Sequence, residues 1–241
     1  MDIPYFVQKK IGNHYLLLMA EGGSDYNHAV TALTAKSLWG PYVPCTVNPV
    51  LTHRHLGKDY PVQSLGHADL VQTPTGDWYA VFLGKRIVEG GLVPLGRETF
   101  LCEVSFQNGE PIFNPGIGVI GNRLKRPLLP WTPVSKTDKQ NDFESSALSP
   151  EWATMRIPEQ PLHHFADGNL FLSLRPEMAD SLVCPSMLLH RVHSHNFSAI
   201  TTMTFSTCQA NEWAGLVLYR TAKGYYSLLK GKNEIRLTID K

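Results

Sequence analysis

Two residues near the middle of the chain could bind a polar ligand. Arg97 lies in PLGRET, just before the apolar run TFLCEVSF, and His67 lies in GHADLV, at the beginning of an alternating strand pattern. A guanidinium is always charged and offers a rigid fork of donors, which suits adjacent hydroxyl groups or a carboxylate that must stay ionised. A neutral imidazole can hydrogen-bond a hydroxyl or ligate a divalent cation. The structural alternatives are a surface or ion-paired Arg97, with Glu98 or Glu103 as partner, and a His67 satisfied inside the core.

A glycine turn upstream carries further polar groups. Glu21 and Ser24 lie in AEGGSD, where the backbone freedom of glycine lets polar groups approach a ligand closely. The alternative is a plain hairpin turn with a solvated glutamate. His53 and His55 in THRH are spaced as a metal pair at i and i+2, but no third ligand lies near them in the sequence. We therefore expect both histidines to be solvated on a loop.

The elements that must position these residues are strands. Short apolar and aromatic runs alternate with Gly, Pro, Asn and Asp throughout the chain, which predicts an all-β fold of antiparallel sheets. Hairpin turns are predicted at TPTGDWY (73–79), QNGEP (107–111) and TAKGYY (221–226). No segment keeps apolar residues at helical spacing for three turns, so any helix should be brief.

The strand pattern is interrupted between Pro115 and Asp142, where prolines and charges dominate. Such a composition is typical of a surface linker between domains. We place an amino-terminal domain at residues 1–126, a linker at 127–140 and a carboxy-terminal domain at 141–241. Two β domains are the simplest interpretation.

The bulk composition limits the classes of partner that the chain is expected to bind. The 22 Lys and Arg nearly cancel the 21 Asp and Glu, so no overall field attracts nucleic acid or an anionic membrane. No run of 18 apolar residues is present, and the early LLLMA stretch is too short and too late for a signal peptide. Four widely spaced cysteines are expected to be free thiols. The compartment, cytoplasmic or secreted, stays open.

Four blocks in the first half carry a resemblance to a known family. They are LLLMAEGGSDYNHAVTALTAKSLWGPY (16–42), NPVLTHRH (48–55), GHADLVQTPTGDWYAVFLGKR (66–86) and PLGRETFLCEVSF (94–106). In order and spacing they resemble the later blades of the five-bladed β-propeller of the family 43 glycoside hydrolases. The second half, from NDFESSALSPEW onward, resembles the concanavalin-like β-sandwich of the β-xylosidase branch, with an incomplete carboxy end. The resemblance implies a partial β-propeller followed by a jelly-roll-like β-sandwich.

The resemblance also implies a reaction. Family members hydrolyse glycosides by inversion, with a general base, a pKa-tuning carboxylate and a general acid, and we expect the first two upstream of Met1. The acid belongs to an E-G-P-H segment before AEGG, where this chain reads DIPYFVQKK. An ungapped count puts Pro4 at that place, and only a two-residue shift brings Asp2 there. We therefore expect no catalytic carboxylate among these residues.

For binding, the resemblance assigns four positions. The matching Arg of the family points into the pocket, which supports Arg97, and His67 is expected in or beneath the same pocket. Most members carry Thr at Ser24, so a hydroxyl is kept, and Glu21 completes the substrate-binding set. No metal ligand or cofactor is assigned, although some members hold calcium through a histidine like His67. The aromatic residues are expected mainly in the core, with sugar stacking as the alternative: Trp39, Trp78, Tyr79, Trp131, Trp152 and Trp213.

The resulting expectation is a fragment of an exo-acting β-1,4-xylosidase or α-L-arabinofuranosidase, inactive by itself. Its partner would be a xylooligosaccharide or an arabinose-substituted oligosaccharide, and the full-length form could be a homo-oligomer. One alternative is a non-catalytic carbohydrate-binding protein. Another is a metal-dependent hydrolase built around His53, His55 and His67. An incomplete propeller would expose strand edges and apolar surface, which predicts self-association.

Overall fold

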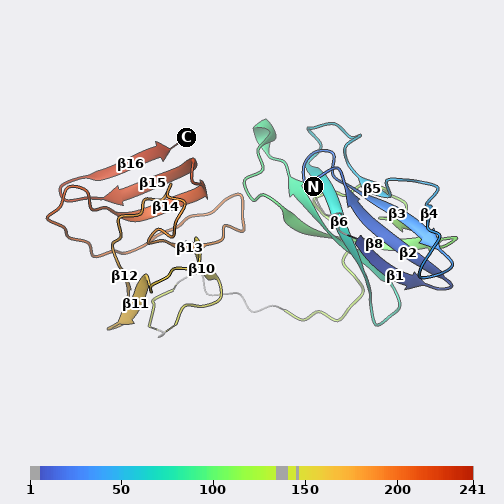
Figure 1. Ribbon diagram of the computed structural model, residues 1–241, viewed down its shortest axis with the longest axis horizontal. Coiled ribbons are helices and arrows are strands. Elements are labelled where there is room, and N and C mark those ends of the chain that lie inside the picture. The colour runs from blue at the N-terminus through green and yellow to red at the C-terminus, as the bar shows by residue number, and fades with distance from the viewer. Residues whose placement is uncertain (1–5, 134–140, 145–146, 241) are drawn as a thin grey trace. The chain divides into compact units, whose positions relative to one another are not determined.

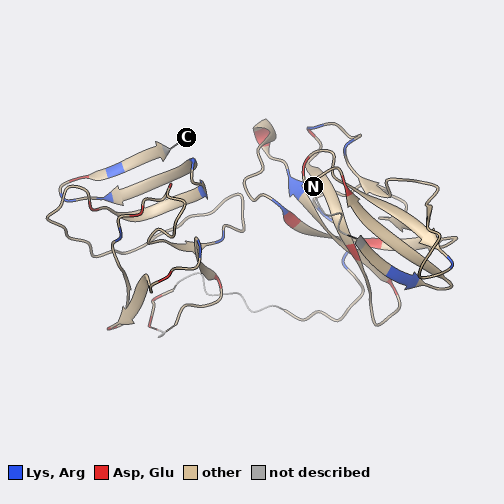
Figure 2. Ribbon diagram, in the orientation of Figure 1, with Lys and Arg blue, Asp and Glu red and all other residues tan. Residues whose placement is uncertain are grey.

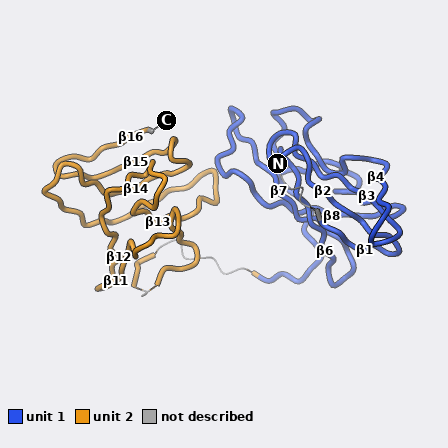
Figure 3. The backbone as a smooth tube through the Cα atoms, in the orientation of Figure 1, with its two compact units in different colours: residues 1–132 blue, residues 133–241 orange. Residues whose placement is uncertain are grey.

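The computed structural model describes residues 6–133, 141–144 and 147–240. The chain divides into two compact units, residues 1–132 and residues 133–241 (Figure 3). Within the described residues the regular elements are strands and one 3₁₀ turn, η1 (Glu89–Gly91), which confirms the all-β prediction. No helix of this described part is long and apolar enough to cross a membrane. The predicted linker 127–140 lies partly outside the described residues, as do Asp2 and Pro4.

Unit 1 contains two antiparallel sheets (Figure 1). The first has the order β1-β2-β3-β4, with β5 also paired to β3. The second has the order β6-β7-β8-β9, each strand hydrogen-bonded to the next one along the chain. The strand bounds are β1 (Phe6–Ile11), β2 (His14–Glu21), β3 (Ala29–Ala35), β4 (Val43–Pro44), β5 (Leu51–Thr52), β6 (Val62–Gln72), β7 (Trp78–Arg86), β8 (Glu98–Gln107) and β9 (Glu110–Phe113).

The two sheets share one hydrophobic core. Alternate residues of β2, such as Leu16 and Leu18, are buried, as a strand with one face on a core requires. β6 packs against β1, β2, β3 and β5, so this strand joins the second sheet to the first. The shared cluster includes Val30 from β3, Leu65 from β6 and Phe82 from β7. Burying each such side chain contributes roughly 1.5–3 kcal/mol.

Two predicted hairpins in unit 1 form as expected. β6 and β7 are antiparallel neighbours joined by residues 73–77, where the Thr73 amide donates to the Asp77 carbonyl at 2.8 Å. β8 and β9 are joined through Asn108 and Gly109, which both have positive φ. The turn residues therefore predict which strands pair, although the register of β6 against β7 shifts twice beyond the turn.

In unit 2 the described residues form three small antiparallel sheets (Figure 1). The third predicted hairpin is also confirmed, since β14 and β15 meet at residues 221–224. The pairs are β10 with β13, β11 with β12, and the ribbon β14-β15-β16. The strand bounds are β10 (Trp152–Thr154), β11 (His163–Ala166), β12 (Asn169–Leu172), β13 (Leu188–His190), β14 (Ala214–Thr221), β15 (Gly224–Lys230) and β16 (Ile235–Asp240).

One face of the β14-β15-β16 sheet is apolar and exposed. Leu216, Leu228 and Leu237 are directly opposite one another across the three strands. Their neighbours on the same face include Leu218 and Tyr226, which are also exposed. An exposed apolar face of this kind favours association.

This face generates a prediction about self-association. The chain should associate at high concentration, and the triple variant Leu216→Thr/Leu228→Thr/Leu237→Thr should raise the midpoint concentration for association at least about tenfold. Threonine keeps the strand propensity while it removes apolar area. Sedimentation velocity across a concentration series measures the effect. Val47→Thr, at an exposed apolar residue of unit 1, is the matched control. A wild-type chain that stays monomeric at high concentration would contradict the prediction.

Candidate functional site

The glycine turn between β2 and β3 brings polar groups beside the second sheet. Gly22 has φ +76°, and a Cβ at this position would lie 2.1 Å from the Asn27 carbonyl oxygen. The turn therefore closes so tightly that only glycine fits. At its end the His28 amide donates to the Asp25 carbonyl at 2.9 Å, which starts β3.

Arg97 and Ser24 come together although they are far apart in the sequence. The Nη1 group of Arg97 donates to Oγ of Ser24 at 3.5 Å, so the residue before β8 contacts the glycine turn. His67 and Arg97 both line a recess of about 450 Å³ on the sheet β6-β7-β8, together with Asp69, Val81 and Thr99. That volume lies within the range of roughly 300–1,000 Å³ for small-molecule sites. Three of the four predicted binding residues are thus linked in one region.

The backbone of β6 aims His67 away from the core. His67 and Ser64 both have φ of 57°, and the pairing of β6 with β7 shifts register between Gln63 and Gly66 and again between Gly66 and Asp69. Left-handed φ is unfavourable for residues with side chains and is common where function sets the geometry. The irregularity leaves His67 exposed while Gly66 faces inward.

Glu21, the fourth predicted binding residue, makes a different contact. Its Oε1 is 3.3 Å from Nη1 of Arg54, and both side chains are partly exposed. The neighbouring Asp25 pairs with Lys85 at 3.2 Å. The hydrogen bond and charge of Lys85 lower the pKa of the Asp25 carboxyl. The turn therefore presents two carboxylates, each paired with a basic side chain, near Arg97 and Ser24.

His28 is a residue of this region that sequence reasoning missed. Its side chain is 3% exposed, and Nδ1 lies 3.2 Å from the Ser64 carbonyl oxygen, to which it donates. Burial lowers the pKa of His28, the hydrogen bond to the Ser64 carbonyl opposes this, and the nearby charges of Arg97 and Lys85 lower the pKa further. The imidazole is neutral at pH 7. The sequence did carry a signal for this role. His28 lies between a glycine turn and the apolar strand AVTALTA, and a polar residue buried there needs a hydrogen-bond partner.

The expectation that His53 is solvated on a loop is wrong. His53 is 1% exposed, and its Nδ1 donates to the Val62 carbonyl at 2.6 Å. The Ile120 amide in turn donates to Nε2 at 2.9 Å. Both ring nitrogens are satisfied by backbone, which fixes the tautomer and holds the segment after β9 against β6. His53 is thus a structural residue, whereas His55 is exposed as expected.

The structure bears on which side chains could bind a metal ion in this region. In the described part of the chain no three His, Cys, Asp or Glu side chains come together in a way that could hold a metal. Both ring nitrogens of His53 are hydrogen-bonded to the backbone, so His53 is not available as a metal ligand. The alternative of a metal-dependent hydrolase built on His53, His55 and His67 therefore lacks one of its three ligands. A cation near His67 would need further ligands of another kind, such as carbonyl oxygens, or ligands from outside these residues.

The aromatic residues divide between core and surface. Tyr79 is buried and Trp78 packs on the core, as predicted, with Trp78 edge-on to Phe106. Trp39 and Trp131, in contrast, are 91% and 71% exposed. The prediction that the aromatic residues are mainly core is wrong for these two, because both lie outside the strands, where no facing sheet covers them.

Comparison with known proteins gives the family. Residues 3–111 match the family described as Glycosyl hydrolases family 43, and residues 140–239 match the Beta xylosidase C-terminal Concanavalin A-like domain. Over these residues the chain belongs to glycosyl hydrolase family 43. The predicted fold class, part of a β-propeller followed by a concanavalin-like β-sandwich, is confirmed with it.

Individual relatives agree with the family match. A xylosidase/arabinosidase from Butyrivibrio fibrisolvens is 36% identical over 95% of this chain and 45% of its own length. A non-reducing end α-L-arabinofuranosidase from Bacteroides ovatus is 36% identical over 94% of the chain and 42% of its own length. A solved family 43 structure from Bacteroides ovatus has a TM-score of 0.82 at 34% identity, covering 98% of this chain and 47% of that one. This chain thus spans less than half the length of these relatives.

The packing of His28 on Gly66 generates a prediction about stability. A Cβ added at Gly66 would lie 2.4 Å from the His28 ring, so Gly66→Ala should lower the free energy of unfolding by about 1–3 kcal/mol. Urea unfolding followed by circular dichroism measures the loss. Gly121→Ala is the control, because its nearest atom beyond its chain neighbours is 3.8 Å away. Adding His28→Ala should recover part of the loss from Gly66→Ala, and simple additivity of the two substitutions would contradict the contact.

His53 and His28 together generate a prediction about pH. Burial lowers the pKa of both histidines in the folded state, so the unfolded chain takes up more protons as the pH falls below about 6.5. Stability should therefore be greatest above that pH and decline between about pH 6.5 and 5. His53→Ala should cost about 2–4 kcal/mol at pH 7.5 and flatten this decline, whereas His55→Ala should do neither. Hydrogen exchange at the Ile120 amide reports the site directly, and unchanged protection in His53→Ala would contradict the assignment.

Proposed function

We propose that this chain is part of a glycoside hydrolase that removes xylosyl or arabinofuranosyl units from the ends of hemicellulose oligosaccharides. The observation that supports it is the cluster of Arg97, Ser24 and His67 in a chain of family 43. A guanidinium fork, a hydroxyl and an imidazole are donors and acceptors that match adjacent sugar hydroxyls. The relatives named above are a xylosidase/arabinosidase and an arabinofuranosidase.

We further propose that these residues bind sugar but do not cleave it. Inverting hydrolysis needs a protonated carboxyl on one side of the glycosidic bond and an ionised one on the other, roughly 6.5–9.5 Å apart. The acidic side chains around the site are each within ion-pair distance of a base. These pairs are Glu21 with Arg54, Asp25 with Lys85, Asp69 with Lys9 and Glu98 with Arg86. A carboxylate held ionised by a cation is a poor proton donor.

The non-catalytic alternative has less support. The described recess could hold sugar without chemistry, but the relatives of this chain are named for hydrolytic activities rather than for binding. Assembly of the longer protein into a homo-oligomer and a calcium ion beside His67 are retained as parts of the proposal. Neither is needed for the binding role of Arg97.

The proposal generates a prediction about turnover. The chain of 241 residues should not hydrolyse p-nitrophenyl β-D-xylopyranoside or α-L-arabinofuranoside, whereas a product extended upstream in the reading frame should hydrolyse at least one of them. In the extended form Arg97→Ala should lower kcat/KM by about 100-fold, with partial recovery in Arg97→Lys. Arg123→Ala, an exposed arginine that does not line the recess, is the control.

Two results would contradict the proposal. Turnover by the 241-residue chain that survives repurification and is lost in Arg97→Ala would show that the acids lie within it. An extended form that hydrolyses neither substrate would remove the assigned reaction. Xylose binding to the shorter chain, followed by saturation-transfer NMR and lost in Arg97→Ala, separates a failure of binding from a failure of chemistry.

A further inference from the structure

A second recess in unit 1 has a different chemistry from the first. It has a volume of about 360 Å³ and lies between β8 and the segment 121–127. Phe100, Leu101 and Leu124 contribute apolar surface to it, and Leu124 also packs on the core, which fixes the segment against the sheet. The polar lining comes mainly from Arg86, Glu98, Asn122, Lys125 and Arg126. We refer to this recess as the basic groove.

The basic groove carries excess positive charge. Glu98 accepts hydrogen bonds from Nε of Arg86 at 2.9 Å and from Nη2 at 2.5 Å, so these two residues neutralise each other. Lys125 and Arg126 have no acidic partner among the described residues. The sequence contains no Asp or Glu between Pro111 and Thr137. Elsewhere, acidic and basic residues are interspersed along both units (Figure 2).

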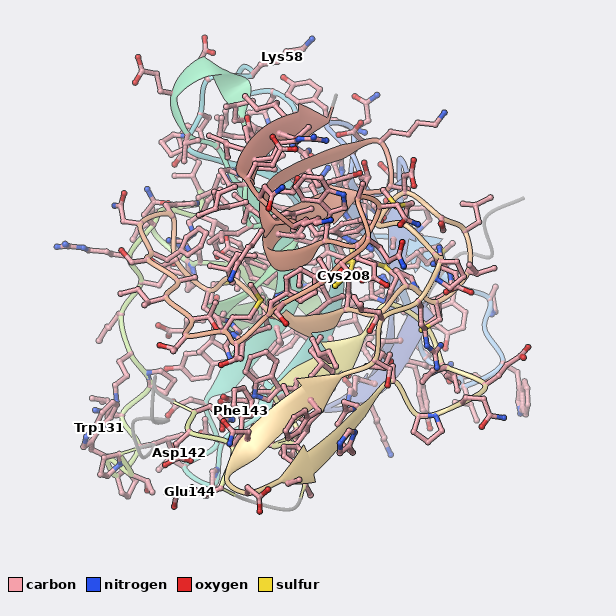
Figure 4. The ribbon with its side chains drawn as sticks, turned by 90° about the vertical axis from the view of Figure 1, so that its left-hand side faces the viewer. Lys58, Trp131, Asp142, Phe143, Glu144 and Cys208 are labelled. Carbon is pink, nitrogen blue, oxygen red and sulfur yellow. The ribbon has the colours of Figure 1, made fainter. Side chains whose placement is uncertain are left out.

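An exposed tryptophan adjoins the basic groove. The guanidinium carbon of Arg126 is 4.8 Å from the centre of the Trp131 ring, and Arg126 also donates to the Leu129 carbonyl. Pro127 and Pro130 restrict the backbone between them. The Trp131 side chain, labelled in Figure 4, is exposed. Its indole is therefore held on one side by Arg126 and open to solvent elsewhere.

We propose that the basic groove binds the carboxylate of an acidic sugar, a uronic acid carried as a side group on an oligosaccharide. Lys125 and Arg126 would pair with the carboxylate, since a guanidinium and a carboxylate match in charge and in shape. Asn122 adds an amide that can bond a ring hydroxyl, and the apolar face of a pyranose fits against an indole such as Trp131. The inference that the ligand is a carbohydrate rests on the proposed function. The inference that the ligand is acidic rests on the charge of the basic groove alone.

The test is binding of three ligands to the full chain by isothermal titration calorimetry. They are xylotetraose with one glucuronic acid side group, unsubstituted xylotetraose and inorganic phosphate. The acidic oligosaccharide should bind at least about fivefold more tightly than the neutral one, and the preference should shrink as salt rises. Lys125→Gln/Arg126→Gln should abolish the preference, and Trp131→Ala should weaken both oligosaccharides. Lys58→Gln is the control, because Lys58 and Trp131 lie at opposite ends of the view in Figure 4.

Each other outcome overturns the proposal. Equal affinity for the two oligosaccharides, or a preference that survives Lys125→Gln/Arg126→Gln, would exclude the basic groove as the acidic-sugar site. Phosphate that binds as tightly as the acidic oligosaccharide would make the groove a general anion site. Arg97→Ala should leave the acidic preference unchanged, so a failed hydrolysis assay with an intact preference would affect the proposed function alone.

Discussion

The packing of the His28 ring on Gly66 is the contact on which the arrangement of unit 1 depends. A histidine from the first sheet lies so close to the backbone of the second that a single methyl group at Gly66 would lie 2.4 Å from its ring. The contact fixes the distance between the glycine turn and β6. Arg97 can therefore reach Ser24 across the two sheets, and His67, the residue after Gly66, is placed in the recess.

A second buried histidine, His53, also bonds the backbone of β6. His53 accepts from the Ile120 amide and donates to the Val62 carbonyl, so it joins three segments that are far apart in the sequence. Burial lowers the pKa of both histidines, and backbone groups bond both ring nitrogens of His53 and Nδ1 of His28. The unit thus uses polar contacts of fixed direction where β6 is too irregular for side-chain packing alone to define its register.

Much of this fold could be predicted from the sequence because strand and turn signals are local. The alternation in LLLMA and AVTALTA and the turn residues at 73–77 and 107–110 specify strands without knowledge of their partners. The proposed binding role of Arg97 rested on family resemblance, since the sequence alone favoured a surface arginine or one paired with Glu98 or Glu103. Glu98 in fact pairs with Arg86. His28 and His53 were missed because their burial depends on contacts with β6 that no local pattern shows, over 36 residues for His28 and Ser64 and nine for His53 and Val62. The exposure of Trp39 and Trp131 was not predicted, because no local sequence pattern shows that a facing sheet is absent.

The geometry of the first recess is the physical basis for our proposal that this chain binds sugar without cleaving it. Val71 and Val81 on its sheet are 47% and 37% exposed, so His67 and Arg97 lie on one open wall. A site that holds a ligand well encloses most of its surface. Hydrolysis by inversion also needs carboxyls on both sides of the bond, and one wall cannot supply them. The ion pairs around the wall add to this, since its acidic side chains are each within ion-pair distance of a base. An opposing surface that covers the two valines would enclose the sugar and exclude water, and proton transfer would then require an unpaired acid from that surface.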